Sequence, residues 1–163
     1  MNALPSRKHL RWQGYDYSKS GNYFITLALQ ERKPILWRAG ETPSDPTKPP
    51  LSTLGKLVET SILSISSIYP GITVDIYCIM PDHVHLIMFI APDANGVTTS
   101  SPPVSVIVGQ LKRWITRQTG KSLWQRSFYD RVIRTDKEYY AIRDYVFYNP
   151  IKIDGADDPL EWP

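Results

Sequence analysis

The sequence has 163 residues, of which 42% are hydrophobic and 21% are charged, with one cysteine and a formal net charge of +3. These values are typical of one globular domain, and they exclude an intramolecular disulfide, a zinc site built from several cysteines and a bilayer-spanning apolar run. The first residues are basic and lack the apolar stretch of a secretory signal, so we expect a cytoplasmic protein with no membrane partner.

Hydrophobic periodicity and turn residues divide the chain into segments of different type. We expect, in chain order, an N-terminal arm (1–20), a strand (21–30), a proline-rich flexible loop (38–50), a helix (54–68), two strands (72–80 and 83–90) joined by Pro81-Asp82, a second flexible loop (91–103), a helix from Val104, a short strand within 124–134, a helix opened by Thr135-Asp-Lys-Glu138 that ends near Asn149, and a tail (151–163).

This order of elements predicts an α+β fold. It matches the ferredoxin-like βαββαβ unit, an antiparallel four-stranded sheet with two helices on one face, followed by one added C-terminal helix. We interpret residues 1–163 as a single domain. In this arrangement the third strand lies in the interior of the sheet.

The third strand carries two histidines inside an apolar run. Residues two apart in a strand project to the same face, so His83 and His85 point together while Val84, Leu86 and Met88 point to the opposite side. Two neighbouring imidazoles form half of a metal site that needs a further donor. A pair of structural histidines satisfied by hydrogen bonds is the alternative.

The last helix carries candidates to complete such a site. Tyr145 and Asn149 are four residues apart and share a helical face beside the apolar positions Ile142 and Val146. A carboxamide oxygen is a ligand for a hard cation, and a phenol oxygen is a nucleophile once its anion is stabilised. An ordinary helix with an interfacial tyrosine and a terminal asparagine has the same pattern.

Positive charge is concentrated between residues 107 and 134. Seven lysines and arginines stand there against one acid, Asp130, and Trp114 and Trp124 are interleaved with them. Cations and aromatic rings together suit phosphate contact and base stacking, although a solvated basic face has the same composition. A basic surface, a two-histidine strand and a Tyr-x-x-x-Asn helix are the parts that phosphodiester transesterification requires.

Four blocks of the chain resemble a known family. They are GYDYSKSGNYFIT from Gly14, MPDHVHLIM from Met80, IVGQLKRWITRQTGKSLWQRSFYDRVIR from Ile107 and IRDYVFYNPIK from Ile142. In this order they resemble the single-tyrosine HUH transposases, most closely the REP-associated tyrosine transposases of bacteria.

The resemblance implies a transposase that cleaves single-stranded DNA and transfers the strand. His83, His85 and Asn149 would bind Mg²⁺ or Mn²⁺, and Tyr145 would form a 5′-phosphotyrosine intermediate. Asn149 stands where many insertion-sequence relatives have the longer glutamine, which requires the helix to lie closer to the metal. The partner would be single-stranded or hairpin DNA on the bacterial nucleoid, and no nucleotide cofactor is expected.

The residues expected to contact the DNA hairpin come from two parts of the chain. They are Arg113, Arg117, Lys121 and Arg126 in the basic region, and Arg7, Lys8 and Arg11 in the N-terminal arm. Relatives act as monomers or as homodimers that exchange the tyrosine helix, and both states stay open, as do the target sequence and the roles of the proline-rich loop and the acidic tail. Three other functions also stay open: a non-catalytic nucleic-acid binder on a ferredoxin-like fold, a metallohydrolase that uses water, and a degenerate copy that binds DNA without cutting it.

Overall fold

The computed structural model describes residues 19–96 and 101–152. Its elements are β1 (Gly21–Ala28), the short 3₁₀ turn η1 (Gln30–Arg32), α1 (Thr53–Ile68), β2 (Ile72–Ile79), β3 (His83–Ile90), α2 (Val104–Thr119), β4 (Tyr129–Ile133), α3 (Asp136–Tyr148) and the 3₁₀ turn η2 (Asn149–Ile151). The predicted arm residues Arg7, Lys8 and Arg11 and the tail after residue 152 lie outside the described residues, as do residues 97–100 of the second predicted loop.

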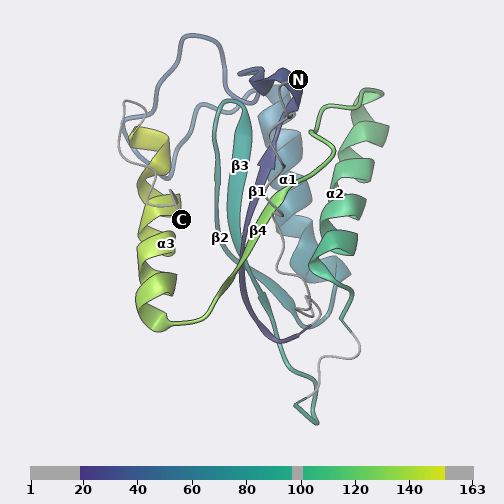
Figure 1. Cartoon of the computed structure of the whole chain (residues 1–163). Coiled ribbons are helices and arrows are strands. Elements are labelled where there is room, and N and C mark those ends of the chain that lie inside the picture. The colour runs from purple at the N-terminus through teal and green to yellow at the C-terminus, as the bar shows by residue number, and fades with distance from the viewer. Residues whose placement is uncertain (1–18, 97–100, 153–163) are drawn as a thin grey trace, which may run out of the picture.

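The four strands form one antiparallel sheet in the order β2-β3-β1-β4. Helices α1 and α2 cover one face of this sheet, and α3 lies against the other face (Figure 1). The arrangement confirms the predicted ferredoxin-like unit with an added C-terminal helix. It also confirms that the histidine strand β3 is interior, because β3 pairs with β2 on one side and with β1 on the other.

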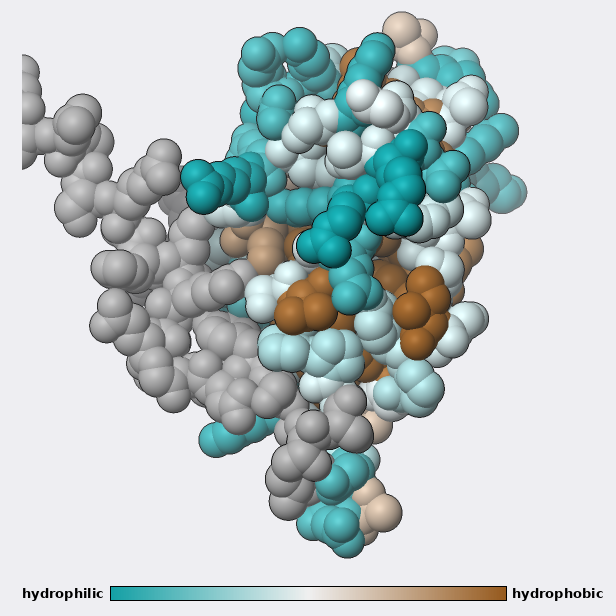
Figure 2. All heavy atoms as spheres, turned by 90° about the vertical axis from the view of Figure 1, so that its right-hand side faces the viewer, coloured by the Kyte–Doolittle hydropathy of each residue, from teal (hydrophilic) through white to brown (hydrophobic). Residues whose placement is uncertain are grey.

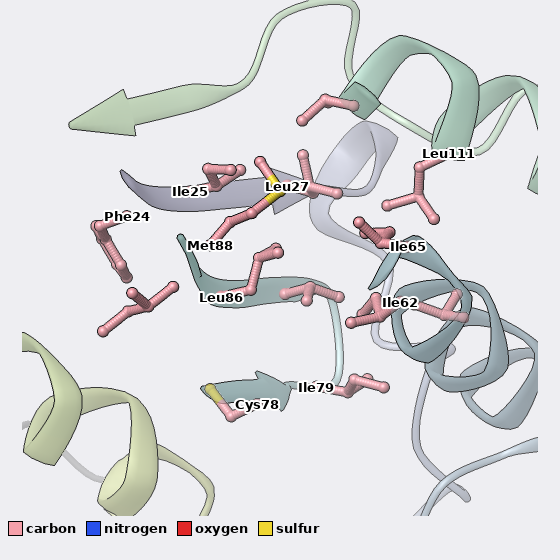
Figure 3. Packing of buried hydrophobic residues seen from close by; sticks show 14 of the residues in the cluster. Phe24, Ile25, Leu27, Ile62, Ile65, Cys78, Ile79, Leu86, Met88 and Leu111 are labelled. Carbon is pink, nitrogen blue, oxygen red and sulfur yellow. The ribbon is translucent and has the colours of Figure 1, made fainter. Parts of the chain in front are cut away.

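The core between the sheet and the two covering helices is built from alternate strand residues. Leu86 and Met88 of β3 and Ile25 and Leu27 of β1 are at most 2% exposed. Figure 3 shows them in one layer with Ile62 and Ile65 of α1 and Leu111 of α2. Because side chains alternate between faces, the intervening residues of β3 project toward α3. The sequence pattern therefore separates a core face from a face that is available for chemistry.

Helix α1 begins where the chain leaves the proline-rich segment. The Ser52 hydroxyl accepts a hydrogen bond from the Gly55 amide at 3.1 Å, which satisfies one of the free N–H groups of the first turn. A β-carbon at Gly55 would overlap the backbone carbonyl oxygen of Leu36, so only glycine allows this close approach. Residues 38–50 contain no helix or strand, and a β-bridge between Trp37 and Leu51 closes the segment at its base.

Helix α3 begins and ends as the sequence predicts. The Thr135 hydroxyl accepts from the Glu138 amide at 3.1 Å. The Glu138 carboxylate accepts from the Arg134 amide at 3.0 Å and pairs with the Arg131 guanidinium at 2.5 Å, which fixes the first turn to β4. The helix ends at Tyr148, two residues before Pro150. Within the described residues, no helix has the length and apolarity needed to cross a membrane.

Candidate active site

The two histidines of β3 lie side by side on the sheet face that α3 covers. The Nε2 atoms of His83 and His85 are 3.0 Å apart, and His85 is 5% exposed. The Phe24 ring of the neighbouring strand stacks on His85 with ring centroids 5.4 Å apart. Both Nε2 atoms therefore converge on one point above the sheet.

The other ring nitrogen of each histidine contacts an oxygen. The Nδ1 atom of His83 lies 2.5 Å from the Asp82 carboxylate, and that of His85 lies 2.7 Å from the Thr26 hydroxyl. A carboxylate only accepts, so the Nδ1–H group of neutral His83 donates to Asp82 and the lone pair of this imidazole is on Nε2. An oxygen that contacts Nδ1 is typical of histidines that bind metals through Nε2.

Burial keeps His85 neutral. Its removal from water lowers the pKa of the imidazole well below the ordinary value, and the positive charge of Arg32, or of His83 whenever that ring is protonated, lowers it further. A neutral imidazole is the form that binds a cation or accepts a proton. The buried environment of His85 thus favours a neutral imidazole that can act as a metal ligand, and it disfavours the protonated form.

Tyr145 of α3 reaches this pair. Its hydroxyl lies 3.3 Å from Nε2 of His85, and the two rings meet edge to face with centroids 5.3 Å apart. Ile142 and Val146, on either side of Tyr145 along the helix, are buried against the sheet. Asn149 caps the end of α3 and donates its backbone N–H to the Tyr145 carbonyl, so both residues stay on the same side of the helix.

A polar latch docks the first half of α3 on β2. The Tyr139 hydroxyl donates to the Asp75 carboxylate at 2.6 Å, and the Arg143 guanidinium lies 4.0 Å from the same carboxylate. Asp75 stands where the pairing of β2 with β3 shifts register, between Val74 and Ile76. An irregularity of this kind re-aims a side chain. The latch therefore helps to set the position of the helix that carries Tyr145.

The two histidines and Tyr145 lie in the wall of an open pocket of about 620 Å³. Its lining includes both histidines, Tyr145, Asn149 and two cations, Arg32 and Lys152. Two neutral imidazoles and a carboxamide form a mixed nitrogen and oxygen donor set that fits a divalent cation. Two ligands at adjacent octahedral positions, each about 2.1 Å from a cation, are about 3.0 Å apart, which is the separation of the two Nε2 atoms. Residues 19–96 and 101–152 contain no cluster of three His, Cys, Asp or Glu side chains that could hold a metal ion, and the Asn149 carboxamide is the candidate for a third donor in the lining.

The turn η1 holds Arg32 at the rim of the pocket in a strained conformation. Glu31 and Arg32 both have left-handed backbone angles, with φ of 56° and 51°. Such angles cost non-glycine residues about 1–3 kcal/mol each and are concentrated at functional sites. Hydrogen bonds from the Leu29 amide to the Asp82 carbonyl and from the Leu36 amide to the Pro81 carbonyl, both 2.9 Å, hold the segment against the β2–β3 turn.

The predicted DNA contacts of α2 lie away from this pocket. Arg113 and Arg117 flank the partly exposed Trp114 and line a groove of about 260 Å³ between α1 and α2, on the opposite face of the sheet. Figure 2, which views the molecule from the α2 side, shows hydrophobic side chains gathered among hydrophilic ones on this face. The structure therefore brings neither arginine to the histidines.

The other two predicted contacts are exposed in the loop between α2 and β4. The Gln125 amide donates to the Ala28 carbonyl at 2.9 Å, and Ala28 pairs with His83 across the sheet. Arg126, next to Gln125, is therefore at the histidine end of the sheet, and Lys121 lies earlier in the same loop.

Five residues that the sequence patterns did not single out also shape the site. Asp82 and Thr26 orient the histidines, Asp75 docks α3, and Arg32 and Lys152 supply positive charge. Asp82 had a local signal, because a carboxylate directly precedes His83. Lys152 also lies close in sequence, three residues after Asn149, whereas Thr26, Arg32 and Asp75 come to the site only through sheet pairing and helix docking.

No family model matches the chain. It is 29% identical to a "Putative REP-associated tyrosine transposase" of Haemophilus influenzae, over 91% of this chain and 80% of that protein. It is 24% identical to a "REP-associated tyrosine transposase" of Escherichia coli, over 90% of this chain and 76% of that protein. A solved structure of a REP-associated tyrosine transposase bound to a REP hairpin has the same fold, with a TM-score of 0.64 and 23% identity over 94% of this chain and 79% of that one.

Proposed function

We propose that this homologue of the REP-associated tyrosine transposases cleaves and rejoins single-stranded DNA beside a hairpin, with Tyr145 as the nucleophile. The observation that carries the proposal is the 3.3 Å contact between the Tyr145 hydroxyl and Nε2 of His85, which lies 3.0 Å from Nε2 of His83 in the same chain. The relatives named as tyrosine transposases support the reaction class.

The reaction exchanges one phosphodiester for another. The Tyr145 hydroxyl gives its proton to water, and its oxygen attacks the scissile phosphorus and forms a new P–O bond, while the bond between phosphorus and the 3′ oxygen breaks. The electron pair leaves with that oxygen, which takes up a proton and becomes a free 3′-OH. The DNA remains joined through its 5′ phosphate to the tyrosine, and attack by another 3′-OH reverses the step and joins the strands. The energy of the bond is retained, so no nucleotide is consumed.

The side chains of the pocket have distinct roles in this reaction. His83, His85 and Asn149 would hold a divalent cation, Mg²⁺ or Mn²⁺. When bound, the cation would supply charge that polarises the scissile phosphate and offsets its developing negative charge. Asp82 and Thr26 keep the imidazoles oriented. Ile142, Val146 and the Asp75 latch keep the Tyr145 oxygen near the phosphate position, which supplies the proximity that such a transfer needs.

The hairpin is the proposed partner. The solved relative is bound to a REP hairpin, and this chain has a basic surface with exposed aromatic area. We assign the phosphate contacts to Arg113, Arg117, Lys121 and Arg126, which attract DNA through charge and counterion release. Because one chain supplies both the histidines and the tyrosine, a monomer is sufficient for cleavage.

A covalent adduct tests the proposal. The protein is incubated with end-labelled single strands that contain hairpins from the intergenic DNA of its own genome, in Mg²⁺ or Mn²⁺, and is then run on a denaturing gel. Wild type gives a protein–DNA adduct. Tyr145→Phe gives none, and the matched control Tyr148→Phe, three residues further on the exposed side of α3, gives the wild-type amount.

Other outcomes of the same gel favour other functions. Cleavage without an adduct indicates a hydrolase that uses water, and binding without cleavage indicates a non-catalytic hairpin binder. An adduct that persists in Tyr145→Phe refutes the assignment of the nucleophile.

A further inference from the structure

We propose that Arg32 is a catalytic residue whose guanidinium binds the scissile phosphate and stabilises the charge that develops on it during strand transfer. The inference rests on the proposed function and names a phosphate-binding residue of the same site. Its basis is the position of Arg32 beside the Asp82 carboxylate, which also contacts His83, in the lining of the pocket that Tyr145 shares.

Arg32 is fixed at its inner end by Asp82. Its Nε atom lies 2.7 Å from Asp82 Oδ2, whereas Oδ1 of the same carboxylate contacts Nδ1 of His83 at 2.5 Å. One carboxylate therefore orients both the arginine and the histidine. The Nη2 atom of Arg32 lies 3.4 Å from Nδ1 of His83, on the Asp82 side of the ring and away from Nε2, so the guanidinium lies beside the histidine without occupying the position of the cation.

The guanidinium has more hydrogen-bonding capacity than this contact uses. Arginine carries five N–H groups in a planar fork that matches two oxygens of a phosphate. The side chain is 52% exposed, so its outer edge is accessible from the pocket. Asp82 restricts the rotamers of Arg32 before any ligand arrives, which lowers the entropy lost when a phosphate binds.

An ion pair with no further function does not explain the left-handed backbone conformation at Glu31 and Arg32. Exposed ion pairs between flexible side chains form readily from relaxed conformations and add little stability. Here Glu31 and Arg32 adopt consecutive left-handed conformations, and two backbone hydrogen bonds tie their segment to the Pro81-Asp82 turn. The chain thus holds Arg32 in a backbone conformation that is unfavourable for arginine. This position is next to the end of the sheet at which β3 begins with His83.

The charges around the pocket favour an anion. Arg32 and Lys152 line it, and Asp82, the one carboxylate among the described residues of the lining, is paired with Arg32 and His83. A phosphodiester that enters the pocket meets positive groups on the Arg32 side and the Tyr145 hydroxyl on the α3 side. Positive charge fixed in advance where negative charge develops accelerates phosphoryl transfer without rearrangement during the reaction.

The test measures single-turnover cleavage of a hairpin oligonucleotide that wild type converts to an adduct. Arg32→Gln lowers the rate constant about 100-fold, and Arg32→Lys, which keeps the charge but loses the fork, lowers it about 10-fold. The matched control is Arg38→Gln, which removes an exposed arginine paired with Glu41 outside the pocket and leaves the rate unchanged.

Two further measurements separate a phosphate contact from an indirect effect on His83. Mn²⁺ affinity, measured by calorimetry without DNA, stays within about 3-fold of wild type in Arg32→Gln, because the Asp82–His83 contact remains. A methylphosphonate at the scissile position removes one charged oxygen. This change slows wild type strongly and slows Arg32→Gln about 10-fold less, because the contact to that oxygen is already lost.

Each outcome decides the assignment. An adduct in wild type together with equal rates in wild type and Arg32→Gln overturns the role of Arg32 and leaves the proposed function in place. Loss of Mn²⁺ affinity in parallel with the rate, or an unchanged methylphosphonate effect, also overturns the phosphate contact. Absence of any adduct in wild type refutes the proposed function, and with it the role of Arg32.

Discussion

Replacing Asp82 by asparagine tests whether the carboxylate orients His83 as a metal ligand. Asparagine keeps the shape and an acceptor oxygen, so the Nδ1–H group of His83 still has a partner. It removes the negative charge that holds this hydrogen bond at 2.5 Å and that anchors Arg32 at 2.7 Å. The change therefore weakens orientation without deleting a side chain.

The structure sets different magnitudes for metal affinity and for stability. Loss of a carboxylate that orients a metal-binding histidine lowers metal affinity about 10–100-fold, which corresponds to about 1.4–2.7 kcal/mol of binding free energy. The Arg32 side chain is 52% exposed, and an ion pair of this exposure contributes only about 0–1 kcal/mol to the free energy of unfolding. Asp82→Asn should weaken Mn²⁺ binding far more than it destabilises the fold.

Calorimetric titration of the metal-free protein with Mn²⁺ measures the affinity, and urea unfolding of the same samples measures stability. Asp93→Asn is the matched control, because its carboxylate accepts a turn hydrogen bond from the Asn95 amide at the opposite end of β3. Equal Mn²⁺ affinity in wild type and Asp82→Asn would show that the Asp82 carboxylate does not orient His83 for metal binding. A loss of stability as large as the loss of binding free energy would also contradict this role.

Three further predictions concern the fold and the docking of α3. Gly55→Ala destabilises the protein by about 1–3 kcal/mol, because its β-carbon would overlap the Leu36 carbonyl. Gly109→Ala, whose β-carbon meets open space, stabilises it by up to about 1 kcal/mol. Urea unfolding in which both variants change stability in the same direction would contradict this. Tyr139→Phe loses its bond to the β2 carboxylate and lowers the rate of adduct formation about 10-fold at unchanged Mn²⁺ affinity, and an unchanged rate would exclude the latch. Burial, followed by the hydrogen bond to Glu59, raises the pKa of Tyr77 to about 12. The stability that the neutral phenol contributes is therefore present below pH 10 and falls as the pH rises toward 12. Between pH 9 and pH 11, urea unfolding should show a larger decrease in the free energy of unfolding for wild type than for Tyr77→Phe.

The histidine face could be predicted from the sequence because it depends on local geometry. Strand alternation places His83 and His85 together whatever the rest of the fold does. The same holds for Tyr145 and Asn149, which share a helical face through their spacing. The start of α3 was also predictable, although the Glu138 carboxylate bonds the amide one residue before the cap instead of the cap itself.

The meeting of these two pairs could not be derived from local patterns. It depends on how α3 docks, and the latch joins Tyr139 to Asp75 across 64 positions of sequence through an irregular point of β2. The position of Arg32 could not be predicted from the sequence for a different reason. Left-handed angles at Glu31 and Arg32 are rare for such residues, and the backbone hydrogen bonds that hold them come from a turn about 50 residues away.

The basic region shows how a linear cluster divides in three dimensions. Helix α2 turns Arg113 and Arg117 into the groove beside α1, whereas the following loop carries Arg126 to the histidine end of the sheet. Composition alone cannot separate these two directions, because both parts have the same residue types. The division indicates that variants of the two groups should be tested separately for hairpin binding.

The most direct test of the central claim is to identify the residue that carries the DNA. Wild-type protein is incubated with a hairpin oligonucleotide and Mn²⁺, the adduct is digested with protease and nuclease, and the nucleotide-bearing peptide is sequenced by mass spectrometry. We expect one modified residue, Tyr145, linked to a 5′ phosphate. A nucleotide attached to any other residue, or cleaved DNA with no modified peptide, would contradict it.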